Sequence, residues 1–229
     1  MTYTHLNILA EGKAEREFAK NVLTEHYFKT KNITVDSRCV ATSRKSRGGL
    51  INYAKFKNDL LKWIKEEQQR QPYFSSMIDL YALPNDFPKF EESLKITDAY
   101  QRVVFLEKAL FDDIAYPKFI PYIQLHEFEA LLLANPANLL LEYPDKTKAV
   151  KQLQEIVKKH SNKPELVNTG KHTSPSKRII QVIPEYESNK VSVGVTLAGI
   201  DDLVSPIEHC KHFREWLEGI TQLIQQQTT

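Results

Sequence analysis

The stretch Leu6-Asn7-Ile8-Leu9-Ala10-Glu11-Gly12 decides the fold class. Its apolar first part predicts a buried strand, and Glu11-Gly12 predicts a turn. A helical pattern follows over about 13–28, in which Ala14, Phe18 and Val22 recur at every fourth residue. A strand that turns directly into an amphipathic helix is typical of the first unit of an α/β sheet.

The same alternation continues along the chain. Further strands are predicted at 33–41, 75–80 and 119–125, and helices at about 50–70, 99–114 and 127–134. This order predicts an α/β fold with a mainly parallel central sheet and helices on both faces.

After residue 135 the pattern is mostly helical. Helices are predicted at about 146–160, 175–183 and 207–224, with a polar loop at 161–176. We therefore expect an α/β core over residues 1–135 and a helical extension packed on it over residues 136–229.

Composition narrows the class of protein. Hydrophobic residues make up 41% of the 229 residues and charged residues 26%, as in soluble globular proteins. No apolar run approaches the roughly 20 residues that a membrane span needs. The first residues do not resemble a signal peptide, and two widely separated cysteines do not form a disulfide scaffold, so we expect a cytoplasmic protein without a membrane partner.

The net charge of +2 conceals strong segregation. Residues 29–70 hold 11 basic and 4 acidic groups, and residues 146–178 hold 9 and 2. Between them, residues 79–145 hold 5 basic and 12 acidic groups. An acidic centre between basic blocks suits a metal site flanked by phosphate-binding surfaces, although charge alone favours solvated helices.

Acidic side chains stand where the predicted strands end. Glu11 follows the first strand, Asp79 ends the third, and Glu127 and Glu129 follow the fourth. Ligand sites of open α/β sheets gather outside the carboxyl ends of the strands. Carboxylates that meet there are ligands for Mg²⁺ or Mn²⁺, which can polarise a phosphodiester.

Each of these acids also has a structural interpretation. Glu15 suits the first turn of a helix, Asp86 could cap the turn before Pro88, and Glu127 could start a helix. The metal hypothesis depends on three strand ends that share one kind of side chain.

The residues around Glu11 resemble a known signature. Ile8-Leu9-Ala10-Glu11-Gly12-Lys13-Ala14-Glu15 is similar to the strand-end motif of Toprim domains, which occur in topoisomerases, primases and the overcoming-lysogenization-defect nucleases. More closely, the chain resembles an uncharacterised bacterial family with a Toprim-like core. Four ordered stretches carry that resemblance: Asp79 to Pro88, Gln124 to Leu132, Ser174 to Arg178, and Cys210 to Leu217.

The resemblance implies roles for several acids. Glu11 would act as general acid/base or metal ligand, Glu15 as a ligand of a second metal, and Asp79 as the first aspartate of the Toprim pair. Tyr81 departs from the pattern because it stands where the second aspartate belongs. Asp86, Glu127 or Glu129 could supply the missing oxygen.

Two basic stretches are candidates for phosphate binding. Ser174, Ser176, Lys177 and Arg178 stand at a predicted helix start, with Lys171 nearby, where helix N–H groups and charged side chains suit a phosphate. A basic surface helix explains them equally well. The loop that contains Arg44, Lys45 and Arg47 could hold a nucleic-acid backbone, although an exposed loop tip is the simpler interpretation.

The sequence argues against two other classes of site. Thr169-Gly170-Lys171-His172 lacks the earlier glycine and the Ser or Thr of a nucleotide-binding P-loop. His209, Cys210 and His212 lack the partner pair of a structural zinc site.

The leading hypothesis is a nuclease that uses Mg²⁺ or Mn²⁺ to cleave phosphodiesters, with Glu11 and Asp79 as catalytic residues. The family resemblance implies an ATPase partner in bacterial genome defence. The alternative is a non-catalytic subunit that binds nucleic acid or an ATPase through a degenerate Toprim site, which Tyr81 favours. The sequence leaves open whether the chain forms a homodimer.

Overall fold

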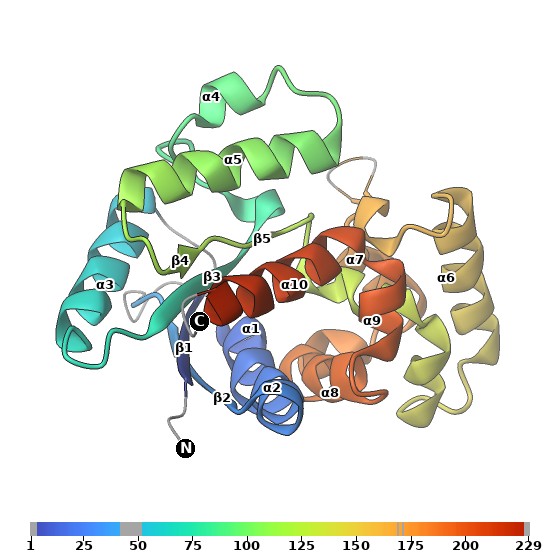
Figure 1. Cartoon of the computed structure of the whole chain (residues 1–229). Coiled ribbons are helices and arrows are strands. Elements are labelled where there is room, and N and C mark those ends of the chain that lie inside the picture. Colours follow the sequence, from blue (N-terminus) through green and yellow to red (C-terminus); the bar gives the residue numbers. More distant parts are fainter. Residues whose placement is uncertain (1–3, 42–51, 169, 171, 227–229) are drawn as a thin grey trace.

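The computed structural model describes residues 4–41, 52–168, 170 and 172–226 (Figure 1). Five strands and ten α-helices account for most of this part of the chain. The strands are β1 Thr4–Ala10, β2 Ile33–Cys39, β3 Tyr73–Asp79, β4 Phe119–Ile120 and β5 Ile123–Gln124. The helices are α1 Lys13–Glu17, α2 Thr24–Lys31, α3 Tyr53–Glu66, α4 Phe90–Ser93, α5 Ala99–Ile114, α6 Thr147–Lys159, α7 Pro175–Val182, α8 Tyr186–Gly199, α9 Val204–His209 and α10 Lys211–Gln226.

The central sheet has the order β2-β1-β3-β4, and β5 continues beside β3. Every pair is parallel, as the sequence predicts. Ala10 of β1 lies opposite Cys39 of β2 and Met77 of β3. The carboxyl ends of the three long strands therefore meet at one edge, and residues just beyond Ala10 and Met77 become neighbours.

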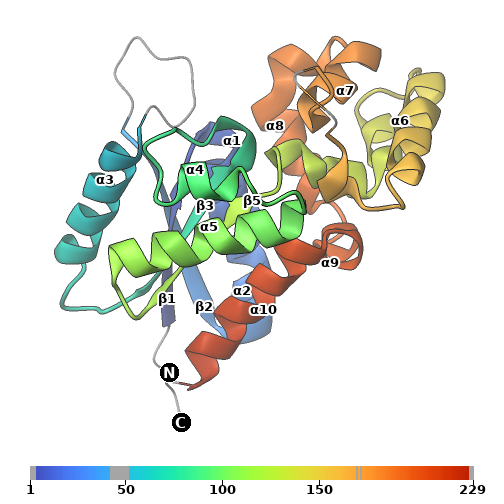
Figure 2. The same ribbon diagram turned by 90° about the horizontal axis from the view of Figure 1, so that it is seen from above.

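Alternation along the strands creates a core on each face of the sheet. In β1, Leu6 and Ile8 join a core with α2 and α10, whereas Leu9 joins a core with α3 and α5. Side chains of successive strand residues point to opposite faces, so a strand buried on both sides feeds both cores. Figure 2 shows α3 and α5 on one side of the sheet and α2 and α10 on the other. The predicted α/β class with helices on both faces is confirmed.

The single strand predicted at 119–125 is two short strands. Pro121 separates β4 from β5, and proline has no N–H for a strand ladder. The Ser76 hydroxyl bridges the gap: its Oγ accepts from the Tyr122 N–H at 2.8 Å and donates to the Tyr122 carbonyl at 3.0 Å. Both short strands still pair with β3.

The helix predicted at 127–134 is wrong in type. Phe128–Ala130 and Leu132–Ala134 form short 3₁₀ turns. Phe128 and all four residues from Ala130 to Leu133 are buried, whereas a surface α-helix buries only one stripe. Tertiary packing therefore determines that this segment forms 3₁₀ turns rather than an α-helix.

The first and last helices are also more divided than predicted. A six-residue π-helical turn, Phe18–Leu23, separates α1 from α2 within the helix expected at 13–28. The last helix is broken at Cys210, whose extended backbone separates α9 from α10. The helices near 50–70, 99–114, 146–160 and 175–183 are present with slightly different ends.

Helix α8 was not predicted. It packs against α1 and the π-helical turn, beside the sheet rather than away from it (Figure 1). Its sequence is rich in valine, which favours strands, and Val193, Gly194, Val195, Leu197 and Ala198 are all buried. Because several sides of the helix are covered, its sequence lacks the single apolar stripe that sequence analysis detects.

The C-terminal helix is attached to the sheet by polar contacts. Trp216 Nε1 donates to Ser75 Oγ at 2.9 Å, and His212 Nε2 lies 2.8 Å from Glu107 Oε1 of α5. The Tyr27 hydroxyl of α2 donates to the Leu217 carbonyl at 3.3 Å. The division into a core over 1–135 and an extension over 136–229 stays a prediction, but the two share one hydrophobic core. No helix in the described part of the chain is long and apolar enough to cross a membrane.

Candidate functional site

A cavity of about 720 Å³ lies at the carboxyl edge of the sheet. Five acidic side chains from three segments of the chain line it: Glu11, Glu15, Asp79, Glu127 and Glu129. Four of the predicted acids come from strand ends, and the parallel sheet brings them together as expected. Glu15 joins them from the first turn of α1.

Glu11 and Asp79 are linked across the edge of the sheet. The Asp79 N–H donates to Glu11 Oε2 at 2.9 Å, and the Glu11 N–H donates to the Met77 carbonyl, also at 2.9 Å. Glu11 is only 8% exposed. The two residues that carry the Toprim resemblance are therefore direct neighbours, although 68 positions separate them in the sequence.

Glu15 closes the turn that begins α1. Its Oε2 accepts from the Gly12 N–H at 3.1 Å, as the third residue of a helix does in a capping box. A Cβ at residue 12 would lie 3.0 Å from this oxygen, so glycine lets the carboxylate come close. The structural interpretation of Glu15 as a first-turn acid is correct, and the same side chain lines the cavity.

Glu127 and Glu129 enter the cavity from the segment after β5. Glu127 Oε2 accepts from the Ser176 N–H at 2.9 Å, which ties this segment to the start of α7. Glu129 Oε1 lies 3.3 Å from Lys190 Nζ of α8, and the Tyr186 hydroxyl donates to the same oxygen at 3.4 Å.

Burial and neighbouring charges raise the pKa values of Asp79, Glu15 and Glu129. Burial raises the pKa of Asp79 well above its usual range, and the negative charges of the four neighbouring glutamates raise it further. Burial and the charges of Glu11 and Glu129 raise the pKa of Glu15 to about 7. Burial also raises the pKa of Glu129, although Lys190 opposes that shift. The cavity therefore holds more negative charge than its own cations offset.

The donor set suits a hard cation. Mg²⁺ and Mn²⁺ prefer carboxylate oxygens, and Asp79 Oδ1 is buried without a hydrogen-bond partner among the described residues. Nevertheless, no three His, Cys, Asp or Glu side chains in the described part of the chain are already grouped as a metal site. Glu11, Glu15 and Glu127 each accept a backbone N–H, which uses one oxygen of each carboxylate.

Two predicted contributors lie outside the cavity wall. Asp86 accepts from the Tyr53 N–H with both oxygens, at 2.9 and 3.0 Å, and so caps the start of α3. Tyr81 is 46% exposed, and its N–H donates to the His126 carbonyl at 3.1 Å. The structure does not bring Asp86 to the other acids, and the second Toprim aspartate has no replacement at position 81. Glu127 and Glu129 do line the cavity.

The predicted phosphate-binding residues are divided. Ser174 and Ser176 are buried at the start of α7, Lys177 is exposed, and Arg178 is half-buried. Because the Ser176 N–H donates to Glu127, this part of the helix start is already bound to an acid. Ser174 Oγ and Arg178 Nε are buried without a partner in the described structure. Arg44, Lys45, Arg47 and Lys171 lie outside the described residues.

Sequence analysis missed the cations of this cavity. Lys190 pairs with Glu129, and Lys13 and Arg16 also line the wall. Lys13 and Arg16 could have been found, because they flank Glu15 at the first strand end. Lys190 could not, because nothing in the pattern of 184–206 indicates a helix that folds back onto this edge.

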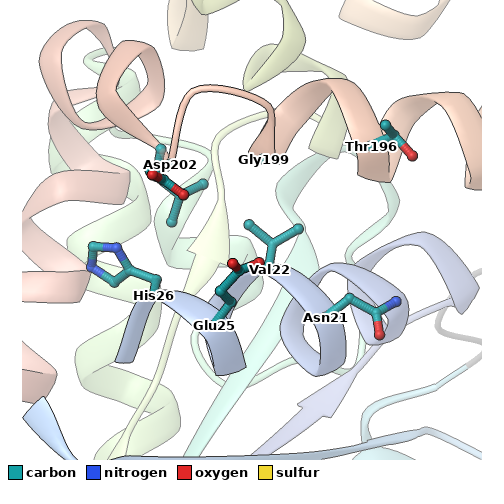
Figure 3. Close-up of a pocket in the computed structure, with 8 residues that line it drawn as sticks. Asn21, Val22, Glu25, His26, Thr196, Gly199 and Asp202 are labelled. Atoms are coloured by element: carbon teal, nitrogen blue, oxygen red, sulfur yellow. The ribbon is translucent and has the colours of Figure 1, made fainter. Parts of the chain in front are cut away.

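A smaller cavity of about 190 Å³ lies away from the strand ends, between α2 and the end of α8 (Figure 3). It includes Glu25, His26 and Asp202. Lys29 lies 2.5 Å from Glu25 and 3.9 Å from Asp202, so these exposed acids share a cation. A Cβ at Gly199 would lie 2.7 Å from the Val22 side chain, which identifies this region as a close helix contact. The cavity at the sheet edge is therefore the better candidate.

Fold and site together define an α/β protein with a carboxylate-lined cavity at the carboxyl edge of a parallel sheet. The chain belongs to the DUF4276 family, a domain of unknown function, whose model matches residues 10–221. The match confirms an uncharacterised family over nearly the whole chain. No curated protein and no solved structure matches the chain.

Proposed function

We propose that this protein is a metal-dependent nuclease with a Toprim-like active site. One observation carries the proposal: five acids from three segments of the chain line one cavity at the carboxyl edge of the sheet, and a buried oxygen of Asp79 has no partner among the described residues. Placing like charges together is unfavourable unless a cation offsets them. Cleavage of a phosphodiester is one of the reactions that metal ions held by protein side chains catalyse.

The residues of the cavity suggest a division of roles. Asp79, Glu11 and Glu129 would hold Mg²⁺ or Mn²⁺, with Glu15 and Glu127 beside them. The bound ion would polarise the phosphodiester and activate water. Glu15, with a pKa of about 7, can accept or release a proton near neutral pH. Lys13 and Arg16 at the wall would attract the phosphate backbone.

A second candidate is a non-catalytic subunit that binds nucleic acid or an ATPase partner. Tyr81 in place of an acid favours it, as does the lack of a ready-grouped set of three ligands in the described residues. In that case the cavity would keep the acids of an ancestral site without cleaving. Such a subunit would be expected to bind its partner without metal.

The test is cleavage of single- and double-stranded DNA and RNA with Mg²⁺, with Mn²⁺ and with chelator. Wild type would run beside Glu11→Gln and Asp79→Asn, and beside Glu91→Gln as an exposed acid on α4 that does not line the cavity. Metal-dependent cleavage that both cavity variants lose and Glu91→Gln keeps would support the nuclease. Cleavage that survives in both variants would contradict this site. If no substrate is cut and neither metal raises the melting temperature, the non-catalytic subunit is favoured.

A further inference from the structure

Helix α6 presents a lysine face to solvent. Lys148, Lys151, Lys158 and Lys159 are all exposed. At about 100° per residue they fall within an arc of about 100° on the helix surface. Val150, Leu153 and Val157 occupy the opposite side and are buried. We call these four lysines the α6 lysine face.

The charge of this face is offset only in part by the chain itself: the exposed Glu155 lies within the same arc, and four lysines against one acid leave a net charge of +3. None of the four lysines forms an ion pair with a residue that the structure describes, whereas neighbouring Lys146 lies 2.6 Å from Glu185. Residues 146–163 hold six lysines and one acid, Glu155. The absence of partners among the described residues leaves a concentrated positive surface.

Helix stability explains Lys158 and Lys159, which stand three and four residues after Glu155, but it does not explain Lys148. The first turn of α6 contains no acidic residue, and Lys148 stands there, where the helix dipole disfavours a cation. Lys148 and Lys151 also repel each other, because residues three apart are neighbours on a helix. Lys158 and Lys159 suit the last turn. A bound polyanion would relieve the unfavourable charge at the first half of the helix.

We propose that the α6 lysine face binds the phosphate backbone of a nucleic acid and extends the substrate-binding surface of the proposed nuclease. From Lys148 to Lys159 the face spans about 17 Å. Duplex DNA presents a phosphate charge about every 1.7 Å of its axis, so a stretch as long as this face offers several phosphates to each lysine. The face contains no apolar side chain that could insert into a membrane.

The position of α6 connects this face to the acidic cavity. Helix α6 packs against α7, and α7 packs against the turn Phe128–Ala130 that carries Glu129. The Ser176 N–H of α7 donates to Glu127 of the cavity. Figures 1 and 2 place α6 and α7 on the side of the molecule opposite α3. One helix, α7, therefore separates α6 from the cavity, and the lysine face lies on the side of α6 opposite its buried residues.

The test is the salt dependence of binding to a labelled 20-base-pair DNA and a 20-nucleotide single strand in chelator, which prevents cleavage. The variant Lys148→Gln, Lys151→Gln, Lys158→Gln is compared with wild type. Its matched control is Lys62→Gln, Lys65→Gln, Lys95→Gln, which removes the same charge from exposed lysines off this face. Each phosphate contact adds about 0.9 to the slope of log affinity against log salt on duplex DNA. We expect the α6 variant to lower the slope by about 2 to 3 and the control by less than about 1.

Three outcomes would overturn the assignment. If variant and control lower the salt slope equally, the attraction is a property of the whole surface. If the α6 variant leaves the slope unchanged, the face does not contact the phosphate backbone. If the face is needed for binding to anionic lipid vesicles and the protein does not bind DNA, the face is assigned to a membrane. Equal melting temperatures of the three proteins check that all are folded. The inference assumes the nucleic-acid substrate of the proposed function, but the two can fail separately: a chain that binds DNA through α6 and never cleaves would contradict only the nuclease.

Discussion

Two groups of buried acids lie in this chain, and they are held in opposite ways. Glu107 accepts from the Ile123 N–H and from His212, both at 2.8 Å. Glu165 is fully buried and accepts the backbone N–H groups of His212 and Phe213 at 3.0 Å. Every one of these contacts brings a donor or a cation to the acid. We call Glu107 and Glu165 the partnered acids.

The acids of the cavity mostly face one another. Glu11, Glu15 and Glu127 also accept hydrogen bonds and Glu129 shares Lys190, but burial and then the charges of four glutamates raise the pKa of Asp79. Burial alone would lower the pKa of His212, whereas its hydrogen bond and the charges of Glu107 and Glu165 raise it. The two groups therefore differ in their neighbours: the partnered acids fasten α10 to α5 and to the chain before it, whereas the cavity acids lie near like charges whose repulsion a cation would relieve.

The largest expected effect comes from a substitution that removes the partner of one of the partnered acids. His212→Ala leaves Glu107 buried without its cation and removes the ring stacked on Tyr122. Loss of one partner of a buried pair costs about 3–5 kcal/mol. We expect the free energy of unfolding in urea to fall by that amount at pH 7.

The control for this change is His209→Ala. His209 is exposed beside Glu208, and its removal should change stability by less than about 0.5 kcal/mol. A loss below about 1 kcal/mol for His212→Ala would show that the two groups of acids do not differ as described.

The next effect concerns the cavity acids and pH. The pKa of Glu15 rises from 4.5 to about 7 on folding, so the folded state holds its proton more tightly. The resulting stability is fully present below pH 4.5 and is lost as pH rises through 7. The shift corresponds to about 3 kcal/mol. Urea unfolding in chelator between pH 4 and 8 should show wild type losing about this much stability relative to Glu15→Gln. Parallel pH profiles for the two proteins would contradict the proposed repulsion.

The smallest expected effect on stability distinguishes the cavity lysine that pairs with an acid, Lys190, from one that does not, Lys13. Lys190→Gln removes the cation 3.3 Å from Glu129, and its partial exposure limits the loss to about 1 kcal/mol at pH 8. Because the pKa of Glu129 is raised, the loss should shrink toward pH 5 as this acid gains a proton. Lys13→Gln, in the same wall without an ion pair in the described structure, should change stability less. A larger loss at pH 5 than at pH 8 would exclude the ion pair as the cause.

Much of the site could be predicted because it depends on local patterns. The strands end at Ala10 and Asp79 as the apolar runs indicate, and parallel pairing brings the residues just beyond these strand ends to one edge. Asp86 could not be separated from the other acids by such patterns. It stands in a Toprim-like stretch, but its partner is the Tyr53 N–H, 33 positions earlier, which no local pattern reveals.

The sequence by itself determined the α/β class, the parallel sheet and the acids at its carboxyl edge. These features come from periodicities of two and 3.6 residues, which neighbouring positions specify. Only the tertiary structure decided that α8 brings Lys190 to Glu129, that α7 donates to Glu127, and that His212 neutralises Glu107. These contacts join residues 49 to 105 positions apart, where the packing of whole helices rather than local preference determines which charges meet.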